Sequence, residues 1–215
     1  MNDTKAPVRP ARIIATAAVL GVIVGVAGIY MTSPATRNES AALCSTDSTV
    51  TDRLKPFARG EVAGVLVPDL PRKLPELRFQ DGEGKDLTLA DFAGKTVLLN
   101  IWATWCAPCR EEMPALNALQ SEMGGDAFTV VAVSIDTQGL DKPRNFLEEL
   151  KIGDLGFYAD PSANLFQELK VAGRGVGLPT TLIVDGEGCE IGYLPGPADW
   201  ASEDAKALIG AALGS

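Results

Sequence analysis

Hydrophobic and polar positions alternate in blocks along most of the chain. Residues 95–102 and 128–136 are nearly continuous apolar runs, the pattern of strands that are covered on both faces. Each run is followed by a segment with helical spacing, residues 109–123 and 143–152, and residues 74–79 form an earlier strand candidate. Strand, helix and strand in series predict a parallel pair joined by a right-handed crossover.

The C-terminal part predicts a different connection. Residues 157–160 and 163–171 continue the series as a short strand and a helix. Residues 180–184 and 189–194 are apolar runs separated by an Asp-Gly turn, which predicts an antiparallel hairpin, and a last helix is expected at 202–213. This order predicts an α/β fold in which helices flank a central mixed sheet.

The N-terminal region carries a separate signal. Residues 13–31 contain no charged side chain and are long enough to cross a bilayer. A cleaved signal peptide has a shorter apolar core, so we expect an uncleaved transmembrane anchor, with cleavage as the alternative. Basic side chains gather in residues 1–12, which predicts a cytoplasmic N-terminus and an exported remainder. We expect a tether and N-terminal extension over residues 32–69 and a compact domain over residues 70–215.

Composition narrows the possible functions. The net charge is −9 at neutral pH, and no basic stripe with interleaved aromatic residues occurs, which argues against nucleic acid as a partner. The chain has four cysteines and no histidine. A zinc site would therefore need all four cysteines.

Cys106 and Cys109 form a CxxC pair within the stretch WATWCAPCREEMP, residues 102–114. Three interpretations compete: half of a zinc site, a structural disulfide, or a redox-active dithiol. The pair falls between a buried strand and the opening turn of a helix, where unpaired amide N–H groups favour a thiolate. We therefore favour the dithiol, with Cys106 as nucleophile and Cys109 as resolving thiol, beside an apolar rim formed by Trp105 and Pro108.

The two residues between the cysteines predict the direction of electron flow. A histidine at this place would help to stabilise the thiolate and make the disulfide a stronger oxidant, and Ala107 and Pro108 cannot do so. We expect a reductant, with a potential nearer to about −270 mV than to about −120 mV.

Three motifs together resemble a known family. They are LTLADFAG at 87–94, KTVLLNIWATWCAPCREEMP at 95–114 and GLPTTLIVDGEG at 177–188. They are similar to membrane-anchored thioredoxin-like proteins of the bacterial envelope, the TlpA/ResA/CcmG group, and within it most to TlpA-type members. The resemblance implies a thioredoxin-like fold in which Pro179 is cis and faces the dithiol. The backbone of Leu178 would then pair with a client peptide as an added strand.

The resemblance also draws attention to two polar positions. Glu112, one helical turn beyond Cys109, matches an acidic residue that this family carries near its dithiol. If partly buried, its carboxyl would have a raised pKa and could handle the proton of the resolving thiol; the alternative is a solvated glutamate favoured by the helix dipole. Asn100 stands where ordinary thioredoxins carry a buried aspartate, so the usual proton acceptor is missing.

Cys44 and Cys189 are left once the active pair is assigned. Because an oxidising compartment seldom leaves structural thiols free, we predict a disulfide between them. It would hold the N-terminal segment against the predicted hairpin. Two unpaired thiols are the alternative.

The resemblance implies a thiol:disulfide oxidoreductase of the bacterial inner membrane, with its folded domain in the periplasm. For TlpA-type members the implied clients are cytochrome oxidase copper-site proteins and their copper chaperone, and for their relatives apocytochromes c. Electrons would come from a membrane donor of the CcdA or DsbD type, and we expect no bound cofactor or metal. A copper-binding chaperone is the rival of another class, although familiar thioredoxin-like examples use a wider cysteine pair and a distant histidine.

Overall fold

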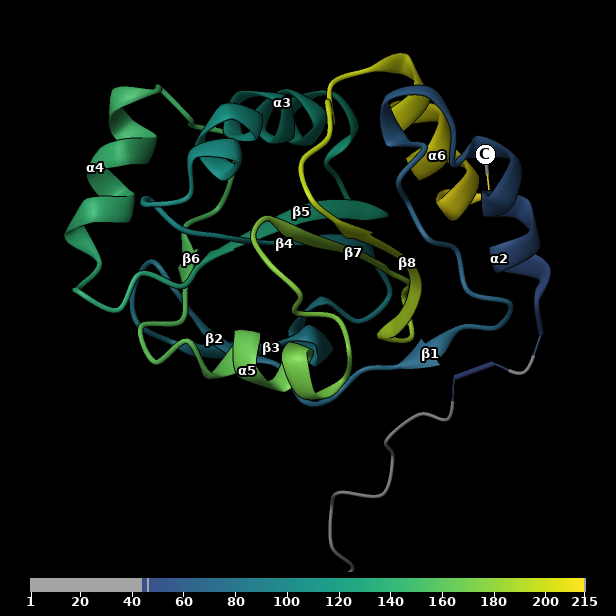
Figure 1. The fold of residues 1–215 in the computed structure, drawn as a ribbon, viewed down its shortest axis with the longest axis horizontal. Helices are drawn as coiled ribbons and strands as arrows, with labels where there is room; N and C mark the ends of the chain where they lie inside the picture. The colour runs from purple at the N-terminus through teal and green to yellow at the C-terminus, as the bar shows by residue number, and fades with distance from the viewer. Residues whose placement is uncertain (1–43, 46, 215) are drawn as a thin grey trace, which may run out of the picture. The chain divides into compact units, whose positions relative to one another are not determined.

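The computed structural model describes residues 44–45 and 47–214. Its strands form one mixed sheet in the order β1-β8-β7-β4-β5-β6-β2-β3 (Figure 1). In that order the strands are β1 (Arg72–Lys73), β8 (Cys189–Pro195), β7 (Thr180–Val184), β4 (Thr96–Trp102), β5 (Phe128–Ser134), β6 (Tyr158–Ala159), β2 (Arg78–Asp81) and β3 (Asp86–Thr88). The predicted α/β architecture with a central mixed sheet is confirmed.

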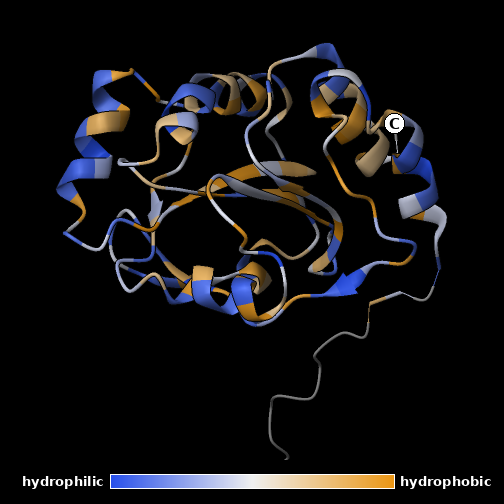
Figure 2. Cartoon of the chain, in the orientation of Figure 1, coloured by the Kyte–Doolittle hydropathy of each residue, from blue (hydrophilic) through white to orange (hydrophobic). Residues whose placement is uncertain are grey.

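The centre of the sheet follows from its continuous apolar runs. Every residue of β4 is buried, and β4 pairs in parallel with β5 and in antiparallel with β7. In Figure 2 these central strands are mostly coloured hydrophobic, whereas the helices alternate between the two colours. The predicted hairpin is also present, since β7 and β8 are antiparallel neighbours.

Helices cover both faces of the sheet. Figure 1 shows α3 and α6 on one side of the central strands and α5 on the other. Ser202 begins α6, because its side-chain oxygen accepts a hydrogen bond from the backbone N–H of Ala205. The helices are α2 (Thr49–Leu54), α3 (Ala107–Met123), α4 (Asp141–Glu149), α5 (Asn164–Val171) and α6 (Glu203–Leu213), with 3-10 helices η1 (Lys55–Phe57), η2 (Gly60–Val62) and η3 (Leu89–Phe92).

Two predicted elements have different bounds in the structure. The strand expected at 74–79 begins only at Arg78, because Pro75 has no N–H to donate to a neighbouring strand. The helix expected at 143–152 begins earlier, since Pro143 fits its first turn, and it ends at Glu149. Lys151 follows with a φ of 57°, which an α-helix cannot accommodate.

The N-terminal extension packs against the rest of the domain. Leu54 and Val62 are fully buried, and α2 and both early 3-10 helices contact α6. Arg53 donates from Nε to the carbonyl oxygen of Ala211 at 2.6 Å. The packed body therefore extends N-terminally of residue 70, where we expected the compact domain to begin.

The predicted membrane anchor, residues 13–31, lies outside the described residues. Within residues 44–45 and 47–214, no helix is long and apolar enough to cross a bilayer.

Candidate active site

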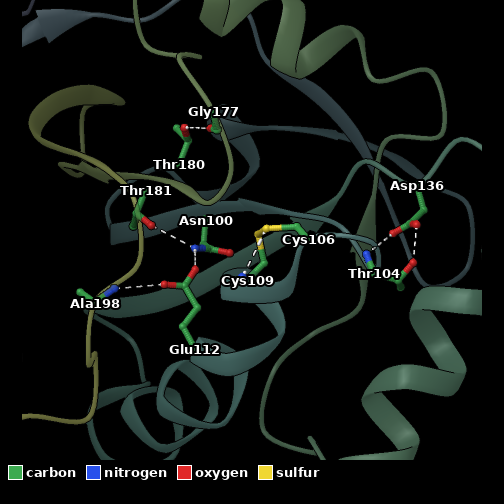
Figure 3. The surroundings of a disulfide bond; sticks show 10 residues. All are labelled: Asn100, Thr104, Cys106, Cys109, Glu112, Asp136, Gly177, Thr180, Thr181 and Ala198. Atoms are coloured by element: carbon green, nitrogen blue, oxygen red, sulfur yellow. Dashed lines mark hydrogen bonds between the residues drawn. A yellow bond between two sulfur atoms is a disulfide. The ribbon is translucent and has the colours of Figure 1, made fainter.

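The CxxC pair lies where the central strand β4 passes into α3. Cys106 occupies the N-cap of α3, and its Sγ accepts a hydrogen bond from the backbone N–H of Cys109 at 3.3 Å (Figure 3). The two cysteines form a disulfide, with 5.3 Å between their Cα atoms. The structure thus shows the oxidised form, with one sulfur at the positive end of a helix dipole.

The two sulfurs differ in access. Cys109 is fully buried, while Cys106 keeps 6% of its surface exposed. Next to them, the Trp105 side chain is 68% exposed and Pro108 is half-buried. Cys106 is therefore the sulfur that a partner can reach, and the rim around it is apolar.

Strand pairing places the proline loop at the dithiol end of the sheet. The peptide bond between Leu178 and Pro179 is cis, the isomer that the family resemblance implied. Thr180, the next residue, begins β7 and pairs with Ile101 near the C-terminal end of β4. Because β4 and β7 are antiparallel, the proline loop lies at the same end of the sheet as Cys106.

Glu112 is not a solvated helix residue. It is only 4% exposed, and Figure 3 shows its carboxylate among Asn100, Ala198 and the dithiol end of α3. Its Oε1 accepts from Asn100 Nδ2 at 2.8 Å, and its Oε2 accepts from the Ala198 backbone N–H at 3.3 Å. Burial raises the pKa of this carboxyl from 4.5 to about 7, and these hydrogen bonds lower it only in part.

Asn100 links Glu112 to the strand that follows the cis proline. Its Nδ2 also donates to Thr181 Oγ1 at 3.0 Å on β7. Its own Oδ1 is buried and has no hydrogen-bond partner within the described part of the chain. The Asn100 amide thus holds the titratable carboxyl of Glu112 beside the dithiol. Asn100 itself stands at the position where ordinary thioredoxins carry a buried aspartate.

Sequence reasoning missed a second buried carboxylate near the dithiol. Asp136 accepts from the Thr104 backbone N–H at 2.9 Å and from Thr104 Oγ1 at 2.6 Å. It also accepts from Ser134 Oγ at 2.8 Å. These bonds fix the loop that precedes Cys106. The only sequence signal for Asp136 was an acidic residue at the end of the apolar run 128–136.

The remaining cysteines lie elsewhere in the fold. Cys44 and Cys189 form a disulfide, the pairing predicted from the sequence, with 5.8 Å between their Cα atoms. It joins the N-terminal extension to the start of β8. In the part of the chain that the structure describes, no group of three or more cysteine or acidic side chains is arranged to hold a metal ion.

The arrangement supports two-electron thiol–disulfide exchange. One sulfur is reachable and faces a helix N-terminus, the second is buried one turn on, and a carboxyl with a pKa of about 7 shares their helix.

Comparison with known proteins agrees with this chemistry. The family model described as Redoxin matches residues 71–209. The thiol-disulfide oxidoreductase ResA of Bacillus thuringiensis subsp. konkukian is 31% identical over 130 residues, which cover 60% of this chain and 70% of that protein. The thioredoxin-like protein YneN of Bacillus subtilis is 48% identical over 63 residues, 29% of this chain and 36% of that protein.

A solved structure is similar over a comparable length. A putative thiol:disulfide interchange protein DsbE from Chlorobium tepidum superimposes with a TM-score of 0.57 at 29% identity. The match covers 66% of this chain and 96% of that one.

Proposed function

The chain belongs to the Redoxin family and is a thiol-disulfide oxidoreductase of the ResA type, and on that premise we propose that it reduces disulfides in client proteins outside the cytoplasm. The observation that carries the proposal is the place of Cys106. Its sulfur caps a helix, accepts an amide N–H and is the reachable member of the pair.

The order of the reaction steps follows from the exposed position of Cys106 and the buried position of Cys109. The Cys106 thiolate attacks one sulfur of a client disulfide; a new sulfur–sulfur bond forms, and the other client sulfur leaves as a thiol. Cys109 then attacks the Sγ of Cys106 and releases the second client thiol. Two electrons and two protons pass to the client, and the product is the Cys106–Cys109 disulfide present in the structure.

Glu112 handles the proton of Cys109 in this proposal. A buried thiol must lose its proton before it can attack, and Glu112 lies on the same face of α3, one turn beyond Cys109. A carboxyl with a pKa of about 7 exchanges protons readily near neutral pH. Asn100 donates to the carboxylate and keeps it in place.

The direction of electron flow is reduction of the client. Ala107 and Pro108 offer the thiolate no hydrogen-bonding side chain beyond the helix N-terminus, which supports a reducing rather than a strongly oxidising dithiol. Reduction outside the cytoplasm needs a steady source of electrons. A membrane donor of the CcdA or DsbD type supplies them, and residues 13–31 anchor the chain in the inner membrane beside that donor.

The first candidate clients are the proteins that form or supply the copper sites of cytochrome oxidase. Their cysteines must be reduced before they can bind copper. Apocytochromes c, with their haem-binding cysteines, are the second candidate. A role as a copper-binding chaperone is less well supported. Thiolates do suit Cu(I), but the chain has no histidine to complete such a site.

A trapping experiment tests this proposal. In the full-length Cys109→Ser variant, only the release step is lost, so client proteins should accumulate as mixed disulfides with Cys106 in native membranes. Cys106→Ser is the matched control and should trap none. Mass spectrometry then identifies the trapped partners. Trapped copper-site proteins would support the first candidate clients, and trapped apocytochromes c would show that the second candidate is correct instead.

A redox titration tests the direction. The full-length protein is equilibrated with glutathione buffers, and fluorescence of the neighbouring Trp102 and Trp105 follows the state of the dithiol. A potential as oxidising as that of strong periplasmic oxidants would contradict reduction of clients.

A further inference from the structure

The loop before the cis proline has few side chains to hold it. Residues 172–178 include three glycines, and Gly173 has a φ of 75°, a conformation that other residues rarely adopt. Val176 in this loop is 76% exposed. Arg174 is its only charged residue. A glycine-rich loop has little order of its own, so its position depends on the contacts it makes.

Arg174 ties this loop to the neighbouring strand β8. Its Nε donates to Glu190 Oε2 at 2.6 Å, and its guanidinium lies over the Tyr193 ring, 5.2 Å from the ring centre. The two charged side chains are 16% and 3% exposed. The main chain of Arg174 is also fixed, because its N–H donates to the Leu169 carbonyl at 2.7 Å.

The other end of this contact is rigid. Glu190 follows Cys189, whose disulfide to Cys44 joins the N-terminal extension to β8. Tyr193 exchanges two backbone hydrogen bonds with Leu66, at 2.8 Å and 3.0 Å. The ion pair therefore connects a loop of low intrinsic order to a strand that is fastened from both sides.

Glu190 is buried and Arg174 is half-buried, and such an ion pair is a weak source of stability because desolvation of the charges offsets their attraction. It does fix geometry. We propose that Arg174 is a positioning residue for the cis-proline loop, and that its ion pair with Glu190 sets how well a protein disulfide docks at Cys106.

This role rests on the proposed function. A client polypeptide pairs with the backbone at Leu178 as an added strand, so its docking depends on where the loop lies. A small disulfide reaches Cys106 without such pairing. Loss of the Arg174 contact therefore penalises protein substrates more than small ones.

The test compares a protein and a small substrate in the full-length enzyme. Reduction of insulin and of the small aromatic disulfide DTNB is measured for the wild type and for Arg174→Gln. We expect the ratio of kcat/KM for insulin to that for DTNB to fall about tenfold, through a higher KM for insulin. Arg174→Lys, which keeps the charge, should restore most of the ratio. Arg78→Gln, which removes an exposed arginine paired with Glu76, is the matched control and should not change it.

A double variant separates positioning from folding. Arg174→Gln with Glu190→Gln leaves no unpaired buried charge, so its stability recovers relative to Arg174→Gln alone. The low insulin ratio should persist in it, because the loop still lacks its side-chain bond to β8. If the ratio recovers together with stability, or if both substrates lose equally, the positioning role is wrong. A wild type that reduces neither substrate instead overturns the proposed function, and the role of Arg174 with it.

Discussion

The two disulfides of this chain lie in contrasting surroundings. Cys106 and Cys109 are three residues apart, whereas Cys44 and Cys189 are 145 residues apart. The chain-entropy relation gives about 2 kcal/mol of stabilisation for the short ring and about 5 kcal/mol as an upper figure for the long one. The short ring can therefore open and close at little cost to folding, while the long one holds an N-terminal segment in place.

The buried glutamates near them differ in the same sense. Glu112, beside the short ring, accepts from an amide and a backbone N–H, and it forms no ion pair within residues 44–45 and 47–214. Glu190, beside the long ring, faces the Arg174 guanidinium. A carboxyl without a cation can take up a proton near neutral pH, whereas a carboxylate paired with arginine serves to hold structure.

The largest expected effect separates the two disulfides by activity. Cys106→Ser removes the nucleophile, so insulin reduction should fall by at least about a thousandfold. Cys189→Ser should retain activity within a few fold per folded molecule, because Cys189 takes no part in exchange. Equal losses in the two variants would remove the distinction between them.

The next effect separates them by stability. Replacing both Cys44 and Cys189 with serine should lower the free energy of unfolding by about 3 to 5 kcal/mol in guanidinium titrations. The matched control replaces Cys106 and Cys109 with alanine and should cost no more than about 2 kcal/mol by the same relation. A smaller loss for the long ring than for the short one would contradict the assignment.

The third effect concerns Glu112 and pH. Its pKa in the fold is about 7, above the ordinary 4.5, so folding disfavours the charged form. The free energy of unfolding should therefore be highest below about pH 4.5 and fall as the pH rises toward 7, by about 3 kcal/mol at most. Denaturant titrations of Glu112→Gln across this range should lack that decline.

Glu190→Gln is the control for this pH dependence, since Glu190 is paired with Arg174. The decline between pH 4.5 and 7 should remain in it. The same variants apply to catalysis: the rate at which Cys109 releases a mixed disulfide should lose its inflection near pH 7 only in Glu112→Gln. A decline that persists in Glu112→Gln would assign it to another group.

The smallest expected effect concerns the hydrogen bonds that hold the N-terminal extension to α6 in addition to the Cys44–Cys189 disulfide. Arg53 donates to carbonyl oxygens of Ala211 and Ala212 at the end of α6. Arg53→Met should cost about 1 kcal/mol in thermal or denaturant unfolding. Arg59→Met, which loses an ion pair with Asp204 at 3.6 Å and the contact of an exposed guanidinium with the Phe57 ring, should stay within about 0.5 kcal/mol.

Elements with strong apolar patterns were predictable from the sequence. The strands β4 and β5 and the helix α3 follow directly from continuous or helically spaced apolar residues, since burial on both faces or on one face dictates such patterns. The position of the dithiol at the N-terminus of α3 was predictable too, because it lies between these two apolar patterns.

Contacts between distant segments were harder to predict. The bonds from Asp136 to Thr104 and from Arg174 to Glu190 depend on the order and register of strands, which the local pattern does not contain. The early helix α2 is short, and its burial comes from packing on α6 rather than from its own periodicity. Glu112 was identified as a site residue through a family resemblance, but only the folded structure shows that its side chain is buried.

The N-terminal extension also protects the outer side of β8. Tyr193 bonds to Leu66 there. Just beyond the extension, β1 pairs with the start of β8 and carries the exposed charges of Arg72 and Lys73. All but the last residue of β8 are buried, so without this cover an apolar strand would present a row of free amide and carbonyl groups. A chain cut at residue 70 would tend to add further copies of itself along that edge. The segment that looks like a spacer thus covers part of the open edge of the sheet.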